Sequence, residues 1–430
     1  MKKILIFASL LMTSALVAAS DDPVLRVFPN GLMWIHKPIH HNGISVARLM
    51  FPSGTAVEPA GEAGVTRLMT SLLFKGTKKK NALAFAQATE GMGVSLDAGA
   101  QEDYWEMSGQ ATTDRFDPFF DLFEEALFQP TFPEEEVKKE RQAQVNAIRT
   151  NKESIFQVAH ELLDSKLYPN HPYGRPEDGD ETVVAGLTQK QVADRYRSAL
   201  DPKGAVLVTV GDLPLDKLTK RVEALVKDWP AHGPAAPAVP PVKYPAGQVM
   251  AEELDPFEQS YLMMAWPAPV IGDPDYAAVK VLNAWLGAGM SSPLFMKVRE
   301  EKGLAYEVAS FSSSHRLGGS FVVYAGMSPA NLEAAQARSE AVIAEAVKAP
   351  LSAEDLESAK RFIRGHFSMD HQTNGRQAWY LCYYQMMGQT WQYDKKYPED
   401  IQKVTSDDVL RVAKKIFAHP PVIIRIRSNK

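Results

Sequence analysis

Apolar residues recur along the chain with two periodicities, one typical of strands and one typical of helices. Residues 25–28 and 32–36 flank a Pro-Asn-Gly turn and predict a hairpin, and residues 45–51 predict a further strand. Residues 94–109 alternate loosely and predict two strands around Gly99. Helices are predicted where apolar residues return every three or four positions, at 65–74, 116–128, 133–150 and 155–167. This mixture predicts an α+β fold, a sheet covered by helices.

The order of predicted elements occurs twice. A charged helix start at residues 132–137 returns at 351–356. A later helix start with Thr188 as its N-cap returns at Thr405, and each of these helices leads into a short run rich in β-branched residues. The three correspondences share one spacing of about 220 residues, which indicates a duplicated unit. We therefore expect two homologous α/β-layer halves.

A proline-rich stretch at residues 229–247 separates the halves, because so many prolines cannot continue a helix or a central strand. At the N-terminus, two lysines precede an apolar run at residues 4–17 and then the small residues Ala18, Ala19 and Ser20. This order is that of a secretory signal peptide, and the run is too short for an ordinary membrane span. The expected organisation is a signal peptide at 1–20, a first domain at 21–228, a linker at 229–247 and a second domain at 248–430.

These segments predict an exported protein, periplasmic or secreted, with no membrane span after signal cleavage; an uncleaved signal anchor is the alternative. The chain has 430 residues, of which 45% are hydrophobic and 23% charged, as in ordinary globular proteins. Its formal net charge of −5 gives no general attraction to nucleic acid, so no nucleic-acid partner is expected. Cys382 is the single cysteine, which excludes an intrachain disulfide and a cysteine-based zinc knuckle.

One predicted helix has the frame of a metal site. In residues 65–74, Arg67, Thr70 and Ser71 lie at i, i+3 and i+4, on the face opposite the apolar residues. A helix with that spacing can offer two histidines to a metal and a carboxylate to the metal-bound water. With its flanks at 54–59 and 73–77, the segment resembles the active-site helix of the pitrilysin-like (inverzincin) zinc metalloproteases. Their His-x-x-Glu-His motif aligns its first His with Arg67, its Glu with Thr70 and its second His with Ser71.

The resemblance places the family's remaining zinc ligand, a glutamate on a downstream helix, at Ala147 within residues 140–149. Every zinc ligand and the general base are therefore missing, and the permanent cation of Arg67 would repel a metal. We predict no metal and no cofactor in this chain, and no peptidase activity of the chain alone. Segments 171–176 and 208–212 also match family signatures, so the resemblance extends over essentially the whole mature chain.

The second half keeps a different part of the family pattern. Residues 291–306 closely match the second-half signature, in which an Arg and a Tyr seven positions apart reach across a clamshell to the zinc-bound substrate. The resemblance assigns this pair to Arg299 and Tyr306. A fixed guanidinium and a neutral hydroxyl donor both suit a peptide carbonyl that becomes an oxyanion. The strand-like segment 94–109 resembles the family's substrate-binding edge, where Ala98, Gly99 and Ala100 would let an extended peptide approach closely.

The resemblance implies that the chain is the non-zinc-binding subunit of a heteromeric zinc metalloendopeptidase and forms half of a clamshell. The zinc would belong to a homologous partner subunit, in a heterodimer or a larger assembly, and the substrate would be a peptide. The alternative is a non-enzymatic peptide-binding or structural scaffold protein of the same fold, able to dimerise with itself. A third hypothesis is an independent peptidase with a relocated metal site. The sequence leaves open the peptide, the cleavage preference, the stoichiometry and the role of Arg67.

Overall fold

The computed structural model describes residues 22–227, 229 and 238–430. The predicted signal peptide at residues 1–20 lies outside the described residues, as do residues 230–237 of the predicted linker. Within the described ranges, no helix combines the length and the apolar character that crossing a membrane requires.

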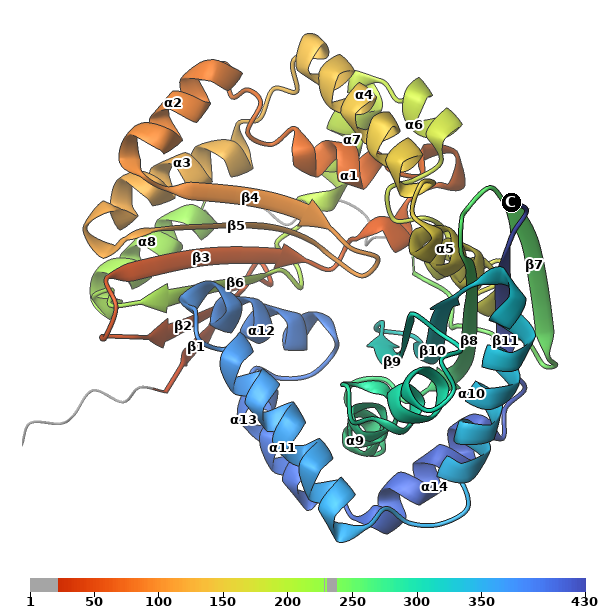
Figure 1. Ribbon diagram of the computed structural model, residues 1–430. Coiled ribbons are helices and arrows are strands. Elements are labelled where there is room, and N and C mark those ends of the chain that lie inside the picture. The colour runs from red at the N-terminus through yellow and green to blue at the C-terminus, as the bar shows by residue number, and fades with distance from the viewer. Residues whose placement is uncertain (1–21, 228, 230–237) are drawn as a thin grey trace, which may run out of the picture.

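The first half is built on a six-stranded sheet with the strand order β1-β2-β6-β3-β5-β4 (Figure 1). Its strands are β1 (Val24–Val27), β2 (Met33–Pro38), β3 (Ile44–Phe51), β4 (Ser95–Ala100), β5 (Trp105–Thr112) and β6 (Val206–Gly211). Its helices are α1 (Val65–Ser71), α2 (Ala82–Met92), α3 (Phe116–Phe128), α4 (Glu134–Asn151), α5 (Ile155–Leu167), α6 (Glu181–Gly186), α7 (Gln189–Ala199) and α8 (Leu215–Lys227).

The second half is built on a five-stranded sheet with the strand order β7-β11-β8-β10-β9. Its strands are β7 (Val249–Asp255), β8 (Ser260–Ala268), β9 (Glu307–Ser314), β10 (Gly319–Met327) and β11 (Val422–Ser428). Its helices are α9 (Tyr276–Gly287), the π-helix η5 (Phe295–Glu300), α10 (Leu332–Ala346), α11 (Ala353–Asp370), α12 (Asn374–Met386), α13 (Tyr393–Lys403) and α14 (Ser406–Phe417).

The two sheets repeat one topology. Each contains one parallel pair, β2 with β6 and β11 with β7, and the other neighbouring strands run antiparallel. The order β2-β6-β3-β5-β4 corresponds strand by strand to β7-β11-β8-β10-β9, and β1 is an addition at the edge of the first sheet. The predicted fold class, two related α+β halves, is confirmed. The exact boundaries at residues 228 and 247 stay predictions.

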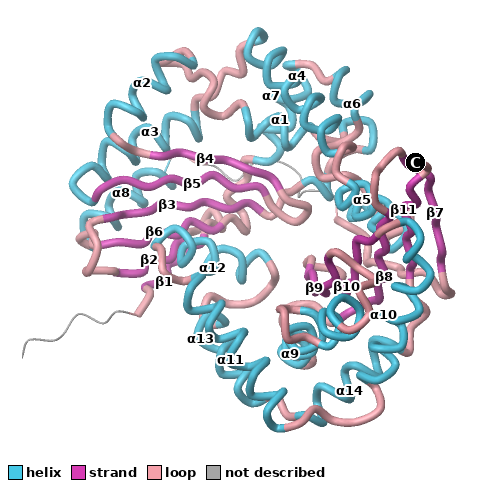
Figure 2. The backbone as a smooth tube through the Cα atoms, viewed as in Figure 1, coloured by secondary structure: helices cyan, strands magenta, loops and turns pink. Residues whose placement is uncertain are grey.

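One helix of each half packs on the sheet of the other half. Helix α12 packs on β3 and β6 of the first sheet, and α5 packs on β8 and β11 of the second (Figure 2). Successive side chains of a strand point to opposite faces of the sheet, which explains how both faces are covered. In β6, Leu207 belongs to the core under the first half's own helices. Val206 and Val208 belong to the core on the other face, together with Leu381 and Cys382 of α12. In the second half, Leu163 of α5 packs in the same way with residues of β8 and β11. The halves therefore share cores.

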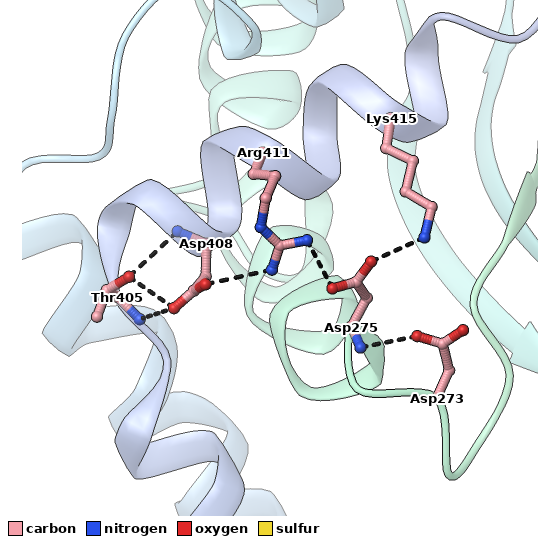
Figure 3. Close-up of polar contacts among 6 residues, drawn as sticks. All are labelled: Asp273, Asp275, Thr405, Asp408, Arg411 and Lys415. Atoms are coloured by element: carbon pink, nitrogen blue, oxygen red, sulfur yellow. Dashed lines mark hydrogen bonds and ion pairs between the residues drawn. The ribbon is translucent and has the colours of Figure 1, made fainter.

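Both predicted threonine N-caps are present. The Thr188 hydroxyl accepts from the N–H of Gln191, and the Thr405 hydroxyl accepts from the N–H of Asp408 at 3.2 Å, each within a reciprocal capping box. Helix α14, which begins after Thr405, is then fastened to the start of α9 (Figure 3). The buried Asp275 carboxylate accepts from Arg411 at 2.6 Å and from Lys415 at 2.8 Å.

Two local predictions need correction. The strands at residues 94–109 do not turn around Gly99, which lies inside β4; the turn spans residues 101–104, closed by the Gln101 N–H donating to the Tyr104 carbonyl at 2.7 Å. The helix predicted at 65–74 ends at Ser71. Beyond it the N–H groups of Leu72 and Leu73 bond three residues back rather than four, so the chain tightens before it leaves the helix.

Candidate functional site

Buried charged groups hold the start of α1 in place. The Glu58 carboxylate accepts hydrogen bonds from the N–H groups of Gly64 at 2.9 Å and Thr66 at 2.6 Å. The buried Arg195 donates from Nε to the Thr66 hydroxyl at 2.9 Å and also contacts the backbone carbonyls of Ser53 and Gly54. Burial raises the pKa of Glu58, although the hydrogen bonds from Thr66 and Gly64 oppose the rise. These bonds fix the start of α1 relative to the preceding loop and to α7.

The four positions aligned with zinc ligands and base carry no metal donor. Arg67 is half-buried, and its Nε lies 3.2 Å from an Asp178 carboxylate oxygen. The Thr70 hydroxyl donates to the Arg67 carbonyl at 2.9 Å, and the Ser71 hydroxyl donates to the Leu68 carbonyl at 3.0 Å, so both return to the backbone of their own helix. Ala147 lies exposed on α4, which packs against α1. The arrangement offers a fixed cation where the resemblance places zinc.

Arg67 pairs with a carboxylate that lines an acidic cavity of about 180 Å³ at the edge of the first half. The walls come from the β4–β5 turn, from α4 and α5, and from residues 175–178. Its carboxylates are Glu102, Glu161, Asp164, Glu177 and Asp178. In the described part of the chain, no group of three or more His, Cys, Asp or Glu side chains is placed to hold a metal ion. Arg175 and His160 also line the cavity, so the carboxylates outnumber the basic side chains of the lining.

Glu177 shows the imbalance most clearly. Burial and the negative charge of Glu102 raise its pKa to about 8, although the Arg67 cation opposes the rise. Its Oε1 atom is buried without a hydrogen-bond partner among the described residues. A carboxyl group with that pKa holds its proton at neutral pH.

His160 lines the same cavity, and its pKa is also raised, which favours the positively charged imidazolium. Its imidazole lies between the rings of Phe156 and Phe311, at centroid distances of 5.8 and 5.9 Å. Burial lowers the pKa of His160, but the Asp164 carboxylate, 3.2 Å from Nδ1, outweighs this and the net shift is upward. The sequence pattern gives no metal motif here, because Asp164 stands where a second histidine would be needed.

The cavity was not foreseen from the sequence. Glu177 and Asp178 directly follow the signature at residues 171–176, and this adjacency was the one available signal. Glu102 and Glu161 are distant from them in the sequence, and no spacing rule connects a strand turn to a helix of the same half.

The second-half pair lies on a helix-to-strand connection. Arg299 belongs to the π-helix η5, and its guanidinium carbon lies 4.9 Å from the centre of the Phe295 ring. Tyr306 directly precedes β9 and is 57% exposed. In the described part of the chain, neither polar end makes a hydrogen bond or ion pair with a protein group. Both side chains are available to a group from outside this chain.

Strand β4 is an open edge of the first sheet, because it pairs with β5 alone. The predicted peptide-binding residues lie at its C-terminal end: Ala98 and Gly99 are half-buried and Ala100 is buried. A Cβ atom added at Gly99 would meet open space, so an approaching chain would not collide with packed atoms there. The α1 helix packs beside this strand. The geometry offers backbone groups for pairing with an extended peptide.

The predicted residues thus form two separate groups. Arg67, Thr70 and Ser71 lie on α1 and Ala147 lies on α4, and these two helices of the first half pack against each other. Arg299 and Tyr306 belong to the second half, and none of their side-chain contacts within the described residues reaches α1, α4 or β4. Within one chain the acidic cavity and the Arg/Tyr connection are two distinct surfaces.

Comparison with family models matches two segments of the chain. Residues 36–180 match the model described as Insulinase (Peptidase family M16), and residues 186–363 match the model described as Peptidase M16 inactive domain. Both models describe parts of one peptidase family, and together they cover most of the chain.

Curated relatives and solved structures agree with this. The chain is 26% identical over 316 residues to the uncharacterized zinc protease YmxG of Bacillus subtilis. The aligned residues cover 73% of this chain and 76% of the relative. It is 31% identical over 288 residues to the uncharacterized zinc protease SCO5738 of Streptomyces coelicolor, covering 65% of this chain and 62% of the relative.

Among solved structures, a peptidase M16 inactive domain from Pseudomonas fluorescens superimposes with a TM-score of 0.88 at 24% identity, covering 95% of this chain and 98% of that chain. A protease from Helicobacter pylori superimposes with a TM-score of 0.87 at 20% identity, covering 95% and 99%. At these identities the superpositions establish the fold.

Proposed function

Because the chain belongs to peptidase family M16, we propose that it is the non-zinc-binding subunit of a two-chain zinc metallopeptidase. Its partner would be a homologous chain that carries the zinc. This chain would contribute Arg299 and Tyr306 to the substrate bound at the partner's zinc site. One observation carries the proposal: the family's metal positions hold Arg67, Thr70, Ser71 and Ala147, whereas the Arg/Tyr connection is exposed and its polar ends are unpaired among the described residues.

The chemistry of the pair suits peptide-bond hydrolysis. Attack of activated water on a peptide carbonyl places negative charge on the carbonyl oxygen. The Arg299 guanidinium is a cation with a planar set of donors, and the Tyr306 hydroxyl adds a further donor. Neither group competes for a metal ion as a carboxylate would. The role of this chain is then to bind and orient the substrate and to stabilise the developing oxyanion.

The open edge at β4 supports a second contribution. An extended peptide that adds to β4 would gain backbone hydrogen bonds, and Gly99, between the small residues Ala98 and Ala100, leaves room for it. We propose that this edge forms part of the peptide chamber when the partner closes over it, so that the chain forms half of a clamshell. The scaffold alternative shares this edge and differs in predicting no contribution to turnover.

Reconstitution tests the proposal. The chain is co-expressed with a homologous chain that has an intact His-x-x-Glu-His motif, and the complex is isolated by size-exclusion chromatography. Cleavage of a peptide library and zinc content are measured for each chain alone and for the complex. The expected result is a stable complex that cleaves peptides, with about one zinc per complex held by the partner, and an isolated chain with neither zinc nor activity. Stoichiometric zinc in the isolated chain, or a complex no more active than the partner alone, would contradict the proposal.

We propose that the mature protein acts outside the cytoplasm. The support is the charged, apolar and small-residue order of residues 1–20. Cell fractionation followed by N-terminal sequencing of the purified protein tests this. A mature N-terminus at residue 20 or 21 in the periplasmic or secreted fraction is expected, whereas an intact Met1 in the cytoplasmic fraction would overturn the assignment.

A further inference from the structure

We propose that Arg338 on α10 is a positioning residue for Arg299. Its guanidinium holds the C-terminal end of η5, the helix that presents Arg299, against the body of the second half. This inference rests on the proposed function of Arg299 and adds a residue outside the matched signature at residues 291–306.

The connection from η5 to β9 has backbone bonds at both ends, but only the strand end is bonded to a neighbouring element. At the strand end, the Tyr306 N–H donates to the Gly326 carbonyl at 2.8 Å, so the register of β9 on β10 fixes Tyr306. At the helix end, the Glu301 N–H donates to the Met296 carbonyl at 2.8 Å. After the turn at Gly303, where φ is +60°, the Gly303 N–H donates to the Arg299 carbonyl at 2.8 Å and the Leu304 N–H to the Val298 carbonyl at 3.1 Å. All of these bonds lie within residues 296–304, and none of them joins η5 to α10.

Arg338 supplies side-chain bonds that join α10 to the helix end. Its Nε donates to the Lys297 carbonyl at 3.1 Å, and one of its terminal nitrogens reaches the Glu301 carboxylate at 3.3 Å. These two acceptors lie on either side of Arg299 in the sequence. The planar guanidinium can satisfy both with a single rigid group, which lysine cannot do. The Arg338 side chain is 26% exposed, so solvent screens its contacts less than those of a free surface arginine.

Two further contacts from the same region act elsewhere on the connection. Lys297 pairs through its side chain with Glu345 near the end of α10, and the Asn331 amide donates to the Leu304 carbonyl at 3.3 Å. Neither contact brackets Arg299. The Lys297 pair holds an exposed side chain, and the Asn331 bond lies after the glycine turn. Arg338 is therefore the side chain through which α10 constrains the backbone at Arg299.

The test compares Arg338→Gln with a matched control, Arg427→Gln. Arg427 also pairs with two carboxylates of the second half, Glu252 and Glu333, but it does not contact η5. First, hydrogen–deuterium exchange of the isolated chain is measured over residues 295–304. Arg338→Gln is expected to speed exchange in this segment and Arg427→Gln to leave it unchanged. Equal exchange in wild type and Arg338→Gln would overturn the proposal without any reference to catalysis.

Second, turnover of the reconstituted complex is measured. Arg338→Gln is expected to lower kcat about tenfold with a small change in KM, because a small misplacement of a reacting group is costly. Arg338→Lys should recover part of the loss. In an Arg299→Ala background Arg338→Gln should have almost no further effect, which a general loss of stability would not produce. Full, independent losses from the two substitutions would overturn the proposal. If the wild-type complex is inactive, the proposed function fails, while the exchange result still decides the positioning role.

Discussion

At the scale of single residues, the most informative feature is the charge of the site around α1. Arg67 places a permanent cation at the first metal position and pairs with Asp178. Carboxylates outnumber the cations in the lining of the adjoining cavity, and burial together with the charge of Glu102 raises the pKa of Glu177 to about 8. The region therefore combines an ion pair at Arg67 with a carboxyl group whose pKa is raised.

The raised pKa of Glu177 predicts a particular pH dependence of stability. Its folded pKa of about 8 lies above the ordinary value of 4.5, so the native state binds the proton more tightly than the unfolded state. The resulting stabilisation is complete below the unfolded pKa and is lost as the pH rises through 8. Glu177→Gln, which cannot ionise, should match wild type near pH 4 and have a higher melting temperature at pH 8.5. Calorimetry across this range checks the prediction, with the exposed Glu135→Gln as control. Parallel pH curves for wild type and Glu177→Gln would contradict it.

Helix spacing alone predicts which residues of the site lie close together only when they belong to one helix. The i, i+3 and i+4 positions of Arg67, Thr70 and Ser71 gave their common face, and the structure places them on α1 as expected. Glu102 and Glu177 meet only because a strand turn and a loop converge, and no local pattern records this. The sequence also does not predict that the Tyr306 side chain is exposed, because a tyrosine beside Leu304 and Ala305 is equally typical of a strand core.

At the scale of elements, the exchange of α5 and α12 between the halves decides how the molecule holds together. The sequence predicts α5 at residues 155–167, the same span that the structure has. Its apolar periodicity specifies a buried face, but the same face would fit either sheet. Which sheet it covers depends on the path of the whole chain, and this is why the exchange could not be predicted locally.

The exchange predicts that the two halves unfold together. Leu163→Ala in α5 and Leu381→Ala in α12 each remove a fully buried side chain from a core shared between the halves. Each substitution should lower the free energy of unfolding by about 2–5 kcal/mol. Chemical denaturation should show a single transition at a lower midpoint for both variants. Two resolved transitions, one unchanged, would show that the halves are independent.

The attachment of α14 to α9 predicts a second pH effect, of opposite sign. Although burial raises the pKa of Asp275, hydrogen bonds from Lys415 and Arg411 outweigh it and hold that pKa below its ordinary value (Figure 3). The stabilisation is therefore present above the unfolded pKa and is lost as the pH falls through the folded pKa. Asp275→Asn should cost about 2 kcal/mol at pH 7, and the difference from wild type should shrink below pH 4. A constant difference between pH 7 and pH 3 in urea denaturation would exclude the ion pairs as its source.

At the scale of the whole molecule, the features divide between the two halves. The first half contributes an open sheet edge at β4 beside a helix frame that lacks metal donors. The second half contributes the exposed Arg299 and Tyr306 on a constrained connection. Under the proposed function such a chain would bind and orient a peptide, and within the described residues it offers no group of side chains placed to hold a metal ion. The proposed assembly therefore requires a second chain to complete one active site.

The most direct test measures turnover of the reconstituted complex with the Arg299→Ala/Tyr306→Phe double variant of this chain. Complex formation and the partner's zinc content are measured in the same samples, with the exposed Arg361→Ala as control. We expect intact assembly, unchanged zinc and a loss in turnover of at least about 10²-fold, the effect typical of removing one oxyanion donor. A double-variant complex that cleaves peptides as fast as the wild-type complex would exclude the proposed role of Arg299 and Tyr306 and leave this chain as a scaffold.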